Sequence, residues 1–338
     1  MSLRQDREER VTTRGDQVVR VGVVGVGRMG QNHARVYEMM KNSVLAGVFD
    51  PDRTAGQAIA AEYGCRAFDS LESMRVEVDA VSICSPSSTH CEVAEFFLSA
   101  GVHCLVEKPL ATTMEECNKV IAAAEKSGAK LLVGHIERFN PAVQQVASMI
   151  SGDNRVLAID TRRLSSFSRR IKDIDVVGDL MVHDLDIINA LVNDDLQRVQ
   201  ASGVCESGGT RDDHVTALLE FAGGAIAVCT ASRITENTVR KLAVTTTSGF
   251  VTVDYMNQSV EIYHQDRVIR RADASSFGEY ALDVSMERLQ VRRAEPLQLE
   301  LLHFIDIISN DGDPLISGKQ GLKAMQLVWD IQSLVQIQ

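Results

Sequence analysis

Two segments of this chain carry side chains suited to proton transfer. Lys108 stands in the tripeptide Glu-Lys-Pro directly after a strand-like run, and Pro109 restricts the residue before it to extended geometry. Asp179 and His183 are four residues apart, which places them on one side of a helix. A carboxylate beside an imidazole sets its tautomer and raises its basicity, so this pair could take a hydroxyl proton. A surface lysine and a capped helix with a structural histidine are the alternatives.

A glycine-rich turn indicates dinucleotide binding. Gly25, Gly27 and Gly30 follow the apolar run Val18–Val24 and open a helical segment, and Asp50 closes the next apolar run 20 residues after the last glycine. The first glycine permits a tight turn, the second lets the backbone approach a pyrophosphate, and the third lets helix and strand pack closely. A carboxylate at the position of Asp50 accepts bonds from ribose hydroxyls and repels a 2′-phosphate, which favours NAD over NADP.

A basic stretch precedes the helix that carries His183. It holds five cations and no acids between Arg162 and Lys172, in a chain of net charge −11. Arginine forks match phosphate oxygens, so the stretch could bind a diphosphate. A solvated basic loop explains the same composition, and the residues alone leave both interpretations open.

The elements that position these side chains follow from an alternation of strand-like and helical runs over the first 135 residues. This alternation predicts an α/β domain with a parallel sheet, right-handed crossovers and helices on both faces, whose ligands bind at the carboxyl ends of the strands. The expected strands are Val18–Val24, Val44–Phe49, Ala80–Cys84, Cys104–Glu107 and Lys130–Gly134. The expected helices are Met29–Met40, Thr54–Tyr63, His90–Ser99 and Met114–Ser127.

After His135 the pattern changes to an α+β domain with a large open sheet. The expected helices are Pro141–Ile150, Leu180–Leu191, Leu297–Ser309 and Lys319–Gln336. The expected strands are Arg155–Leu164, Gln197–Val204, His214–Phe221, Ala225–Ser232, Lys241–Thr247, Phe250–Tyr255 and Val260–Tyr263, with hairpin turns at Gly223-Gly224 and Ser248-Gly249. An open sheet needs its free face covered, so we expect a homodimer or homotetramer formed through it. The predicted division is a flexible tail over 1–17, a nucleotide-binding domain over 18–135 and a substrate-binding and oligomerisation domain over 136–338.

Composition narrows the class of protein. The 338 residues are 45% hydrophobic and 24% charged, as in a globular protein with a good core. The acidic balance argues against nucleic-acid and membrane-surface partners, and no run is apolar and long enough to cross a membrane. The start of the chain has no apolar signal core, and the seven cysteines form no CxxC pair. We expect reduced thiols in a cytoplasmic protein and no metal site.

Several of these motifs together resemble the glucose-fructose oxidoreductase / inositol dehydrogenase / MocA family. They are GVGRMG, the turn Ser85-Pro86-x-x-Thr89-His90, Glu-Lys-Pro, D-x-x-x-H and the C-terminal segment PLQLELLHFID…DPLISGKQGLKAM. The resemblance implies a Rossmann dinucleotide-binding domain followed by an open, mixed-sheet domain, and oxidation or reduction of a sugar or cyclitol carbon with a nicotinamide cofactor. It makes Lys108 the active-site lysine and matches Asp179 and His183 to the catalytic acid and histidine. The family motif usually reads D-x-G-x-H, whereas here Met181 replaces the glycine, a departure that concerns the shape of the substrate pocket more than the catalytic pair.

Within that family, the segments GHIERFNPAV and RRIKDIDVVGDLMVHDLDIINAL are most similar to UDP-N-acetylglucosamine 3-dehydrogenases. Those proteins oxidise the C3 hydroxyl of the sugar, and a UDP diphosphate would give the basic stretch a role. An inositol or free-sugar dehydrogenase shares most of the motifs. A nucleotide-bound sensor without catalysis and a reductase of an unsaturated or imine substrate are further alternatives.

The expected site residues fall into three groups. The catalytic ones are Lys108, His183 and Asp179. Those expected to contact NAD are Gly25, Gly27, Arg28, Met29, Gly30, Asp50, Ser85, His90, Glu107 and Lys108. Those expected to contact the sugar or UDP-sugar are Arg138, Asn140, Arg163, Arg169, Arg170 and His183.

Overall fold

The computed structural model describes residues 18–150, 153–166, 175–206, 212–270 and 280–335, and these form two compact units. Unit 1 comprises the described residues up to Gly134 together with Glu300–Gly318. Unit 2 comprises His135–Leu299 and the residues from Lys319 onward. The expected boundary near residue 135 lies at this division. Glu300–Gly318, which we expected in the second domain, clusters instead with the first.

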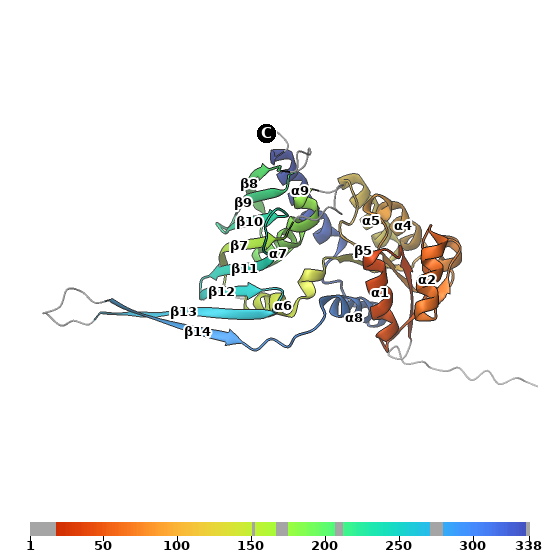
Figure 1. The fold of residues 1–338 in the computed structure, drawn as a ribbon, viewed down its shortest axis with the longest axis horizontal. Helices are drawn as coiled ribbons and strands as arrows, with labels where there is room; N and C mark the ends of the chain where they lie inside the picture. The colour runs from red at the N-terminus through yellow and green to blue at the C-terminus, as the bar shows by residue number, and fades with distance from the viewer. Residues whose placement is uncertain (1–17, 151–152, 167–174, 207–211, 271–279, 336–338) are drawn as a thin grey trace, which may run out of the picture. The chain divides into compact units, whose positions relative to one another are not determined.

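Unit 1, whose chain begins at the red end of the ribbon in Figure 1, contains a parallel six-stranded sheet in the order β3-β2-β1-β4-β5-β6. This is the strand order of dinucleotide-binding sheets, so the predicted fold class is confirmed. The strands are β1 (Val19–Val24), β2 (Ser43–Phe49), β3 (Arg66–Ala67), β4 (Ala80–Ile83), β5 (His103–Glu107) and β6 (Leu131–Gly134). The helices are α1 (Arg28–Met39), α2 (Arg53–Tyr63), α3 (Leu71–Arg75), α4 (His90–Leu98) and α5 (Met114–Ser127), with a 3₁₀ turn at Ser87–Thr89. Every expected element agrees with these bounds to within one residue, whereas β3 and α3 are additional.

Local sequence explains these elements. All residues of β4 and β6 are buried, as expected of central strands covered on both faces. Helix α2 begins at Asp52, whose carboxylate accepts the backbone N–H groups of Thr54 and Ala55. Helix α5 begins with a capping box between Thr113 and Glu116.

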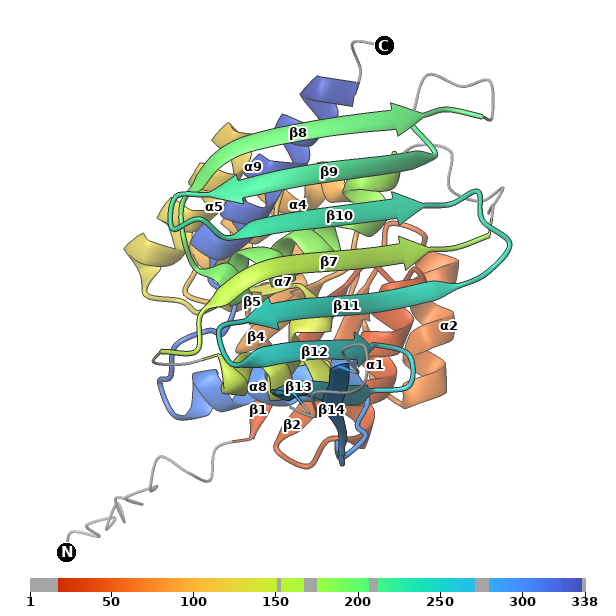
Figure 2. The same cartoon turned by 90° about the vertical axis from the view of Figure 1, so that its left-hand side faces the viewer.

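Unit 2 is built on an eight-stranded mixed sheet in the order β14-β13-β12-β11-β7-β10-β9-β8 (Figure 2). Strands β7 and β10 pair in parallel and the other neighbours pair antiparallel. The strands are β7 (Val156–Leu164), β8 (Leu196–Val204), β9 (His214–Phe221), β10 (Ile226–Ser232), β11 (Val239–Thr246), β12 (Gly249–Asp254), β13 (Ser259–Arg270) and β14 (Tyr280–Leu289). The helices are α6 (Pro141–Met149), α7 (Val182–Val192) and α9 (Gly318–Val335), with a 3₁₀ turn at Ile136–Phe139 and a π-helix at Val177–Met181. Helix α8 (Pro296–Ser309) begins in unit 2 and belongs to unit 1 from Glu300 onward.

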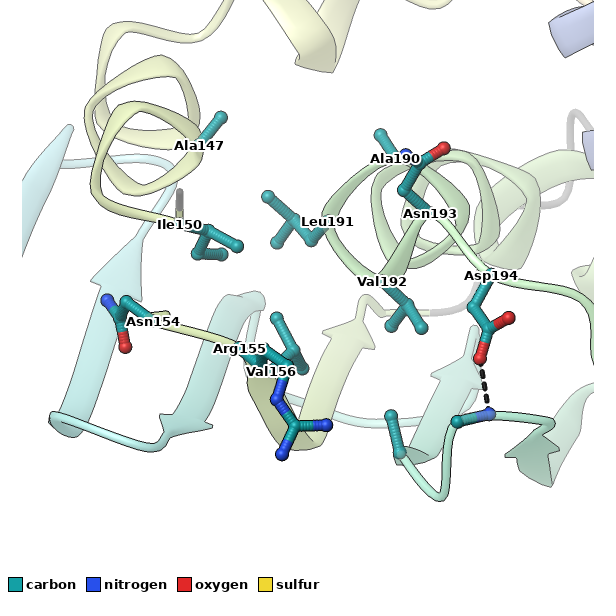
Figure 3. Close-up of a pocket in the computed structure, with 12 residues that line it drawn as sticks. Ala147, Ile150, Asn154, Arg155, Val156, Ala190, Leu191, Val192, Asn193 and Asp194 are labelled. Carbon is teal, nitrogen blue, oxygen red and sulfur yellow. Dashed lines mark hydrogen bonds between the residues drawn. The ribbon is translucent and has the colours of Figure 1, made fainter. Parts of the chain in front are cut away.

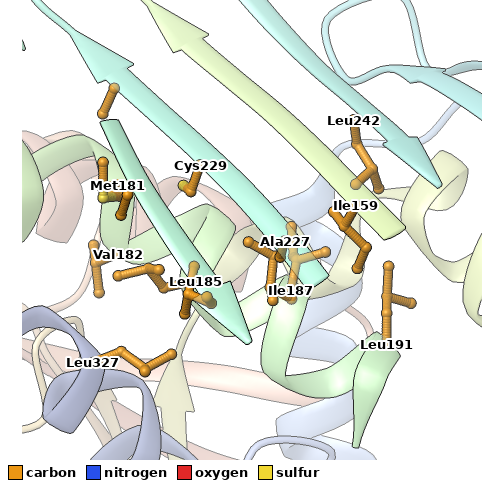
Figure 4. Packing of buried hydrophobic residues seen from close by; sticks show 14 of the residues in the cluster. Ile159, Met181, Val182, Leu185, Ile187, Leu191, Ala227, Cys229, Leu242 and Leu327 are labelled. Carbon is orange, nitrogen blue, oxygen red and sulfur yellow. The ribbon is translucent and has the colours of Figure 1, made fainter. Parts of the chain in front are cut away.

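The core of unit 2 lies between one face of this sheet and its helices. Figure 4 shows Leu185 and Ile187 of α7 packed against Ala227 and Cys229 of β10, and all four are fully buried. Along the strands burial alternates, so the opposite face keeps polar and half-exposed side chains. The sheet is therefore open on one side, as predicted. No helix in the described part of the chain is long and apolar enough to cross a membrane.

The end of the sheet departs from our expectation. Strand β13 continues past Tyr263 to Arg270, and β14 was not predicted at all. Together they form a two-stranded ribbon that extends beyond the other strands of unit 2 (Figure 1). Backbone pairing joins the two strands. In β14 Leu282, Val284 and Met286 alternate with Asp283, Ser285 and Glu287, a strand pattern that our sequence prediction overlooked.

Candidate functional site

The glycine turn after β1 is held by backbone contacts that no side chain would permit. Gly25 has a φ of +85°, and a Cβ atom on it would lie 2.7 Å from the Cα atom of Ser85. A Cβ atom on Gly30 would lie 1.8 Å from the carbonyl oxygen of Gly25. Gly27 differs, since nothing lies within 4 Å of its added Cβ atom. Gly27 also caps the start of α1, where free N–H groups attract phosphate, and Arg28 beside it is exposed.

Asp50 has a role that the sequence did not reveal. Its Oδ2 atom accepts the backbone N–H of Val26 at 2.8 Å, and its Oδ1 atom accepts that of Asp52 at 2.9 Å. The carboxylate therefore joins the end of β2 to the glycine turn. Each oxygen retains a second lone pair, so this arrangement is compatible with the expected bonds to ribose.

Glu107, the last residue of β5, is the centre of a buried set of contacts. Its Oε1 atom lies 3.0 Å from Nε2 of His33 on α1, and its Oε2 atom accepts the backbone N–H of Lys108 at 3.2 Å. A Cβ atom on Gly134 would lie 3.2 Å from the Glu107 carboxyl carbon, so the neighbouring strand also limits where the side chain can be. Lys108 is half-buried, and the peptide bond between it and Pro109 is cis.

His90 connects this loop to the turn after β4. It is 1% exposed, and its two ring nitrogens lie 2.7 Å from the carbonyl oxygen of Pro109 and 2.9 Å from that of Ser85. Ser85 in turn shares a 2.7 Å hydrogen bond with Thr89. This geometry makes His90 a brace between two loops at the carboxyl edge of the sheet. Direct contact of Ser85, His90 and Met29 with a cofactor stays a prediction.

In unit 2, Asp179 and His183 lie on successive helical segments. Asp179 belongs to the π-helix and His183 to the first turn of α7, and both side chains are half-buried. The π-helix is anchored by Asp175, whose carbonyl oxygen accepts the N–H of Asp179 and whose carboxylate accepts that of Gly178. Single π-helical turns within α-helices are frequent at functional sites. The regular helix that we predicted here is therefore locally widened.

Arg163 is the centre of a buried ionic network. Its guanidinium donates to both carboxylate oxygens of Asp184, at 2.8 and 3.0 Å, and to Glu137 at 2.9 Å. The guanidinium also lies 5.2 Å from the centre of the Tyr255 ring. Burial opposes the charge of Arg163, but the two carboxylates hold its pKa well above the ordinary value. Arg163 is 3% exposed, and its guanidinium N–H groups are already bonded to Asp184 and Glu137. The geometry therefore does not support the expected contact with phosphate.

The other expected substrate residues are placed differently. Arg138 lies 3.5 Å from Asp186 and is largely buried. Asn140 caps α6 and donates to the carbonyl oxygen of Tyr255. Arg169 and Arg170 lie outside the described residues. The structure thus groups Ser85, His90, Glu107 and Lys108 at one edge of unit 1, and groups Arg163 with the helix of His183 in unit 2.

A well-formed hollow in unit 2 is separate from these groups. It has a volume of about 450 Å³ and lies where α6 and α7 end (Figure 3). Aliphatic side chains and Arg155 line it, and its Asp194 carboxylate accepts the backbone N–H of Gly223. None of the expected site residues lines this hollow, and His183 lies at the opposite end of α7.

Comparison with known proteins agrees with the predicted family. A family model described as "Oxidoreductase family, NAD-binding Rossmann fold" matches residues 19–135, and one described as "GFO/IDH/MocA C-terminal domain" matches residues 149–252. A UDP-N-acetylglucosamine 3-dehydrogenase from Acidithiobacillus ferrooxidans is 40% identical over 247 residues, which cover 73% of this chain and 77% of that protein. An inositol 2-dehydrogenase from Rhizobium meliloti is 28% identical over 325 residues, covering 91% and 94%.

Solved structures show the same architecture. A structure titled as the Acidithiobacillus ferrooxidans UDP-N-acetylglucosamine 3-dehydrogenase has a TM-score of 0.86 at 33% identity, covering 94% of this chain and 98% of that one. A scyllo-inositol dehydrogenase from Lactobacillus casei, whose title names bound NAD(H) and scyllo-inositol, has a TM-score of 0.78 at 18% identity, covering 95% and 98%. At that identity the second likeness concerns the fold alone.

The contrast between Gly27 and Gly30 gives a first prediction. Gly27→Ala should leave the free energy of unfolding nearly unchanged, because its Cβ atom meets no protein atom, but weaken NAD binding about tenfold or more. Gly30→Ala should lower the free energy of unfolding by about 1–3 kcal/mol or more, because α1 must move from the Gly25 carbonyl. Urea unfolding and calorimetric NAD titration separate the two effects. Equal loss of stability in both variants would contradict this assignment.

A second prediction concerns the ionic network. Arg163→Met should lower the free energy of unfolding by about 3–5 kcal/mol, because Asp184 and Glu137 are left buried without their cation. Arg53→Met is the control, since this arginine is exposed at the start of α2, and it should change stability by less than about 0.5 kcal/mol. Urea unfolding without any ligand measures both. A stable Arg163→Met protein with weakened UDP-sugar binding would restore the role in phosphate recognition.

Proposed function

Because this chain belongs to the glucose-fructose oxidoreductase / inositol dehydrogenase / MocA family of NAD-binding oxidoreductases, we propose that it oxidises the C3 hydroxyl of a UDP-N-acetylhexosamine. The proposed substrate rests on the 40% identity to a UDP-N-acetylglucosamine 3-dehydrogenase over 73% of the chain. The geometry that supports the chemistry is the half-buried Lys108 after β5, whose backbone N–H is held by Glu107 and whose neighbour Pro109 is held by His90.

The cofactor in this proposal is NAD rather than NADP. The residues present fit it, because the open space at Gly27 and the start of α1 would receive the pyrophosphate. Asp50 would accept the hydroxyls of the adenosine ribose, and its negative charge would repel a 2′-phosphate. Glu107 would line the nicotinamide end of the site. When bound, NAD supplies the acceptor for a hydride.

The proposed mechanism uses one group from each unit. Lys108 donates a hydrogen bond to the sugar hydroxyl oxygen and lowers its pKa. His183 takes the hydroxyl proton as a general base, and Asp179 orients its ring. The electron pair of the carbon–hydrogen bond would leave with the hydrogen as a hydride, and the electron pair of the oxygen–hydrogen bond would become the second carbon–oxygen bond. The products would be a ketone, NADH and a proton.

Recognition of the diphosphate falls to the basic stretch. Arg163 in this stretch is already bonded to Asp184 and Glu137. The proposal therefore assigns the phosphates to Arg169 and Arg170. A cyclitol or free sugar is the alternative substrate, favoured by the 28% identity to an inositol 2-dehydrogenase over 91% of the chain. No disulfide joins any of the seven cysteines, all of which lie in described residues, and this supports a reducing compartment such as the cytoplasm.

We also propose that two or four copies assemble through the open face of the sheet in unit 2. On this face a hollow of about 510 Å³ is lined by charges of both signs, among them Asp160, Arg162, Lys241, Glu261 and Arg288. Such a surface can meet a copy of itself, because a two-fold axis can bring acidic side chains of one copy opposite basic side chains of the other.

Assembly is tested by reversing charge on that face. Arg162→Glu combined with Lys241→Glu should shift the protein toward monomers, measured by light scattering after size-exclusion chromatography, because the paired surface then carries excess negative charge. Lys126→Glu on the exposed surface of α5 should leave the assembly unchanged. An unaltered mass in the double variant would exclude this face as the interface.

The catalytic assignment predicts the behaviour of two variants. Lys108→Ala and His183→Ala should each lower kcat by about 10²–10⁴, because each removes a group that acts on the hydroxyl proton, while the NAD dissociation constant changes little. Absorbance of NADH under saturating substrate measures the first quantity and NAD titration the second. Near wild-type turnover in either variant would remove that residue from the mechanism.

The substrate is tested by thermal shift in the presence of NAD. UDP-N-acetylglucosamine should raise Tm, because a ligand that binds only the folded protein stabilises it, whereas UDP alone should give part of the shift. Free N-acetylglucosamine and myo-inositol are the comparison ligands. A shift with inositol and none with any UDP-sugar would favour the cyclitol alternative.

A further inference from the structure

Unit 1 contains a buried cluster of acid and base groups that the proposed mechanism leaves unexplained. His33 of α1, Glu107 of β5 and Glu300 of α8 each bring a side-chain donor atom within 4.8 Å of the others. His33 and Glu300 are fully buried and Glu107 is 8% exposed. Two carboxylates and one imidazole, each from a different chain segment, thus lie together in the interior and are shielded from water.

Glu300 is the member of this cluster whose polar side-chain atoms all lack a hydrogen-bond partner. Glu107 is bonded to the ring of His33 and to the backbone N–H of Lys108, whereas neither carboxylate oxygen of Glu300 has a hydrogen-bond partner. An ionised carboxylate without partners is strongly disfavoured in such surroundings, and a second carboxylate nearby disfavours it further. A protonated Glu300 would remove both penalties and would have Glu107 as the acceptor for its proton.

The other titratable groups facing Glu300 do not compensate its charge. Tyr37 on α1 bonds the hydroxyl of Ser82 instead, and Cys84 after β4 is a neutral thiol whose pKa is raised by burial and by the two carboxylates. Burial and the charge of Glu107 likewise hold the pKa of Glu300 well above the ordinary value.

We propose that Glu300 is a positioning residue, held as a neutral carboxylic acid that donates its proton to Glu107. The shared proton fixes the Glu107 carboxylate and keeps a single negative charge beside Lys108 and the nicotinamide end of the cofactor site. The consequence for NAD rests on the function proposed above, whereas the protonation of Glu300 does not. Donor spacing alone would also suit a divalent cation, but Oε1 of Glu107 and Nε2 of His33 are already bonded to each other, which favours the proton.

The direct test is infrared spectroscopy of the full chain without substrate. The wild-type protein at pH 7 should show the carbonyl stretch of a protonated carboxylic acid, and Glu300→Gln should lose that band. Asp306→Asn, an exposed position on the same helix, is the control and should keep it. Absence of the band from the wild type would overturn the proposal. So would about one equivalent of a divalent metal in the purified protein that Glu300→Gln abolishes.

Stability as a function of pH gives an independent readout. With a raised pKa in the folded state, Glu300 keeps its proton in the folded chain while the unfolded chain loses it above about pH 4.3. The wild type therefore loses stability relative to Glu300→Gln as the pH rises from that value toward the folded-state pKa. The difference in Tm between Glu300→Gln and wild type should grow by about 2 °C or more between pH 5 and pH 8. A difference that is constant with pH would count against a buried acid.

The positioning role is tested by comparing two replacements. Glu300→Gln keeps a donor toward Glu107 and should bind NAD within about twofold of wild type, whereas Glu300→Leu removes the donor and should weaken NAD binding about tenfold. In the assay, Glu300→Leu should raise the KM for NAD more than it lowers kcat. Equal binding of NAD by both variants would overturn the positioning role. If Glu300→Leu does not fold, the infrared test with Glu300→Gln still decides whether Glu300 is protonated. If no sugar is oxidised but the infrared band is present, the proposed function fails while the buried acid stands.

Discussion

The contact between Gly30 and the carbonyl oxygen of Gly25 is the constraint on which unit 1 depends. A side chain on Gly30 would be 1.8 Å from that oxygen, so α1 can begin where it does only because the residue is glycine. The same placement brings His33, one turn later on α1, to the carboxylate of Glu107 at 3.0 Å. Glu107 then accepts the backbone N–H of Lys108. One close backbone approach thereby fixes both the end of the helix that would face phosphate and the loop that carries the proposed catalytic lysine.

The sequence predicts well those elements that depend on neighbouring residues, and poorly those that depend on contacts between distant parts of the chain. The central strands of unit 1 are short, mostly apolar runs that are largely buried, which is why their ends were predicted within one residue. Strand β3 consists of Arg66 and Ala67 alone and has no period to detect. The π-helix at Val177–Met181 was read as regular helix, because both conformations suit the same apolar pattern. Glu300–Gly318 joins unit 1 through contacts distant in sequence, which no local pattern reveals.

The contacts of the candidate site residues likewise depend on tertiary structure that the sequence does not reveal. Asp50 was expected at the ribose, but its bonds to Val26 and Asp52 depend on two loops meeting in space. Arg163 was read as a phosphate ligand because it lies in a cationic stretch, and charge composition does not tell which way a guanidinium faces. Glu300 did leave a signal. It stands one turn from both Leu297 and Phe304 on the apolar stripe of α8, a position where a carboxylate is unfavourable without a specific reason.

Each unit therefore places a buried charge network beside a proposed catalytic residue. Glu107 with His33 and Glu300 adjoins Lys108, and Arg163 with Asp184 and Glu137 adjoins His183. Burying charge rarely increases stability over apolar packing of the same volume, so stability alone does not account for two such networks. Catalytic groups, by contrast, must be held within fractions of an ångström, and buried hydrogen-bonded supports provide that rigidity. On this argument the proposed chemistry would reside in elements fixed by these networks, while the choice of substrate would be left to residues outside them, such as Arg169 and Arg170.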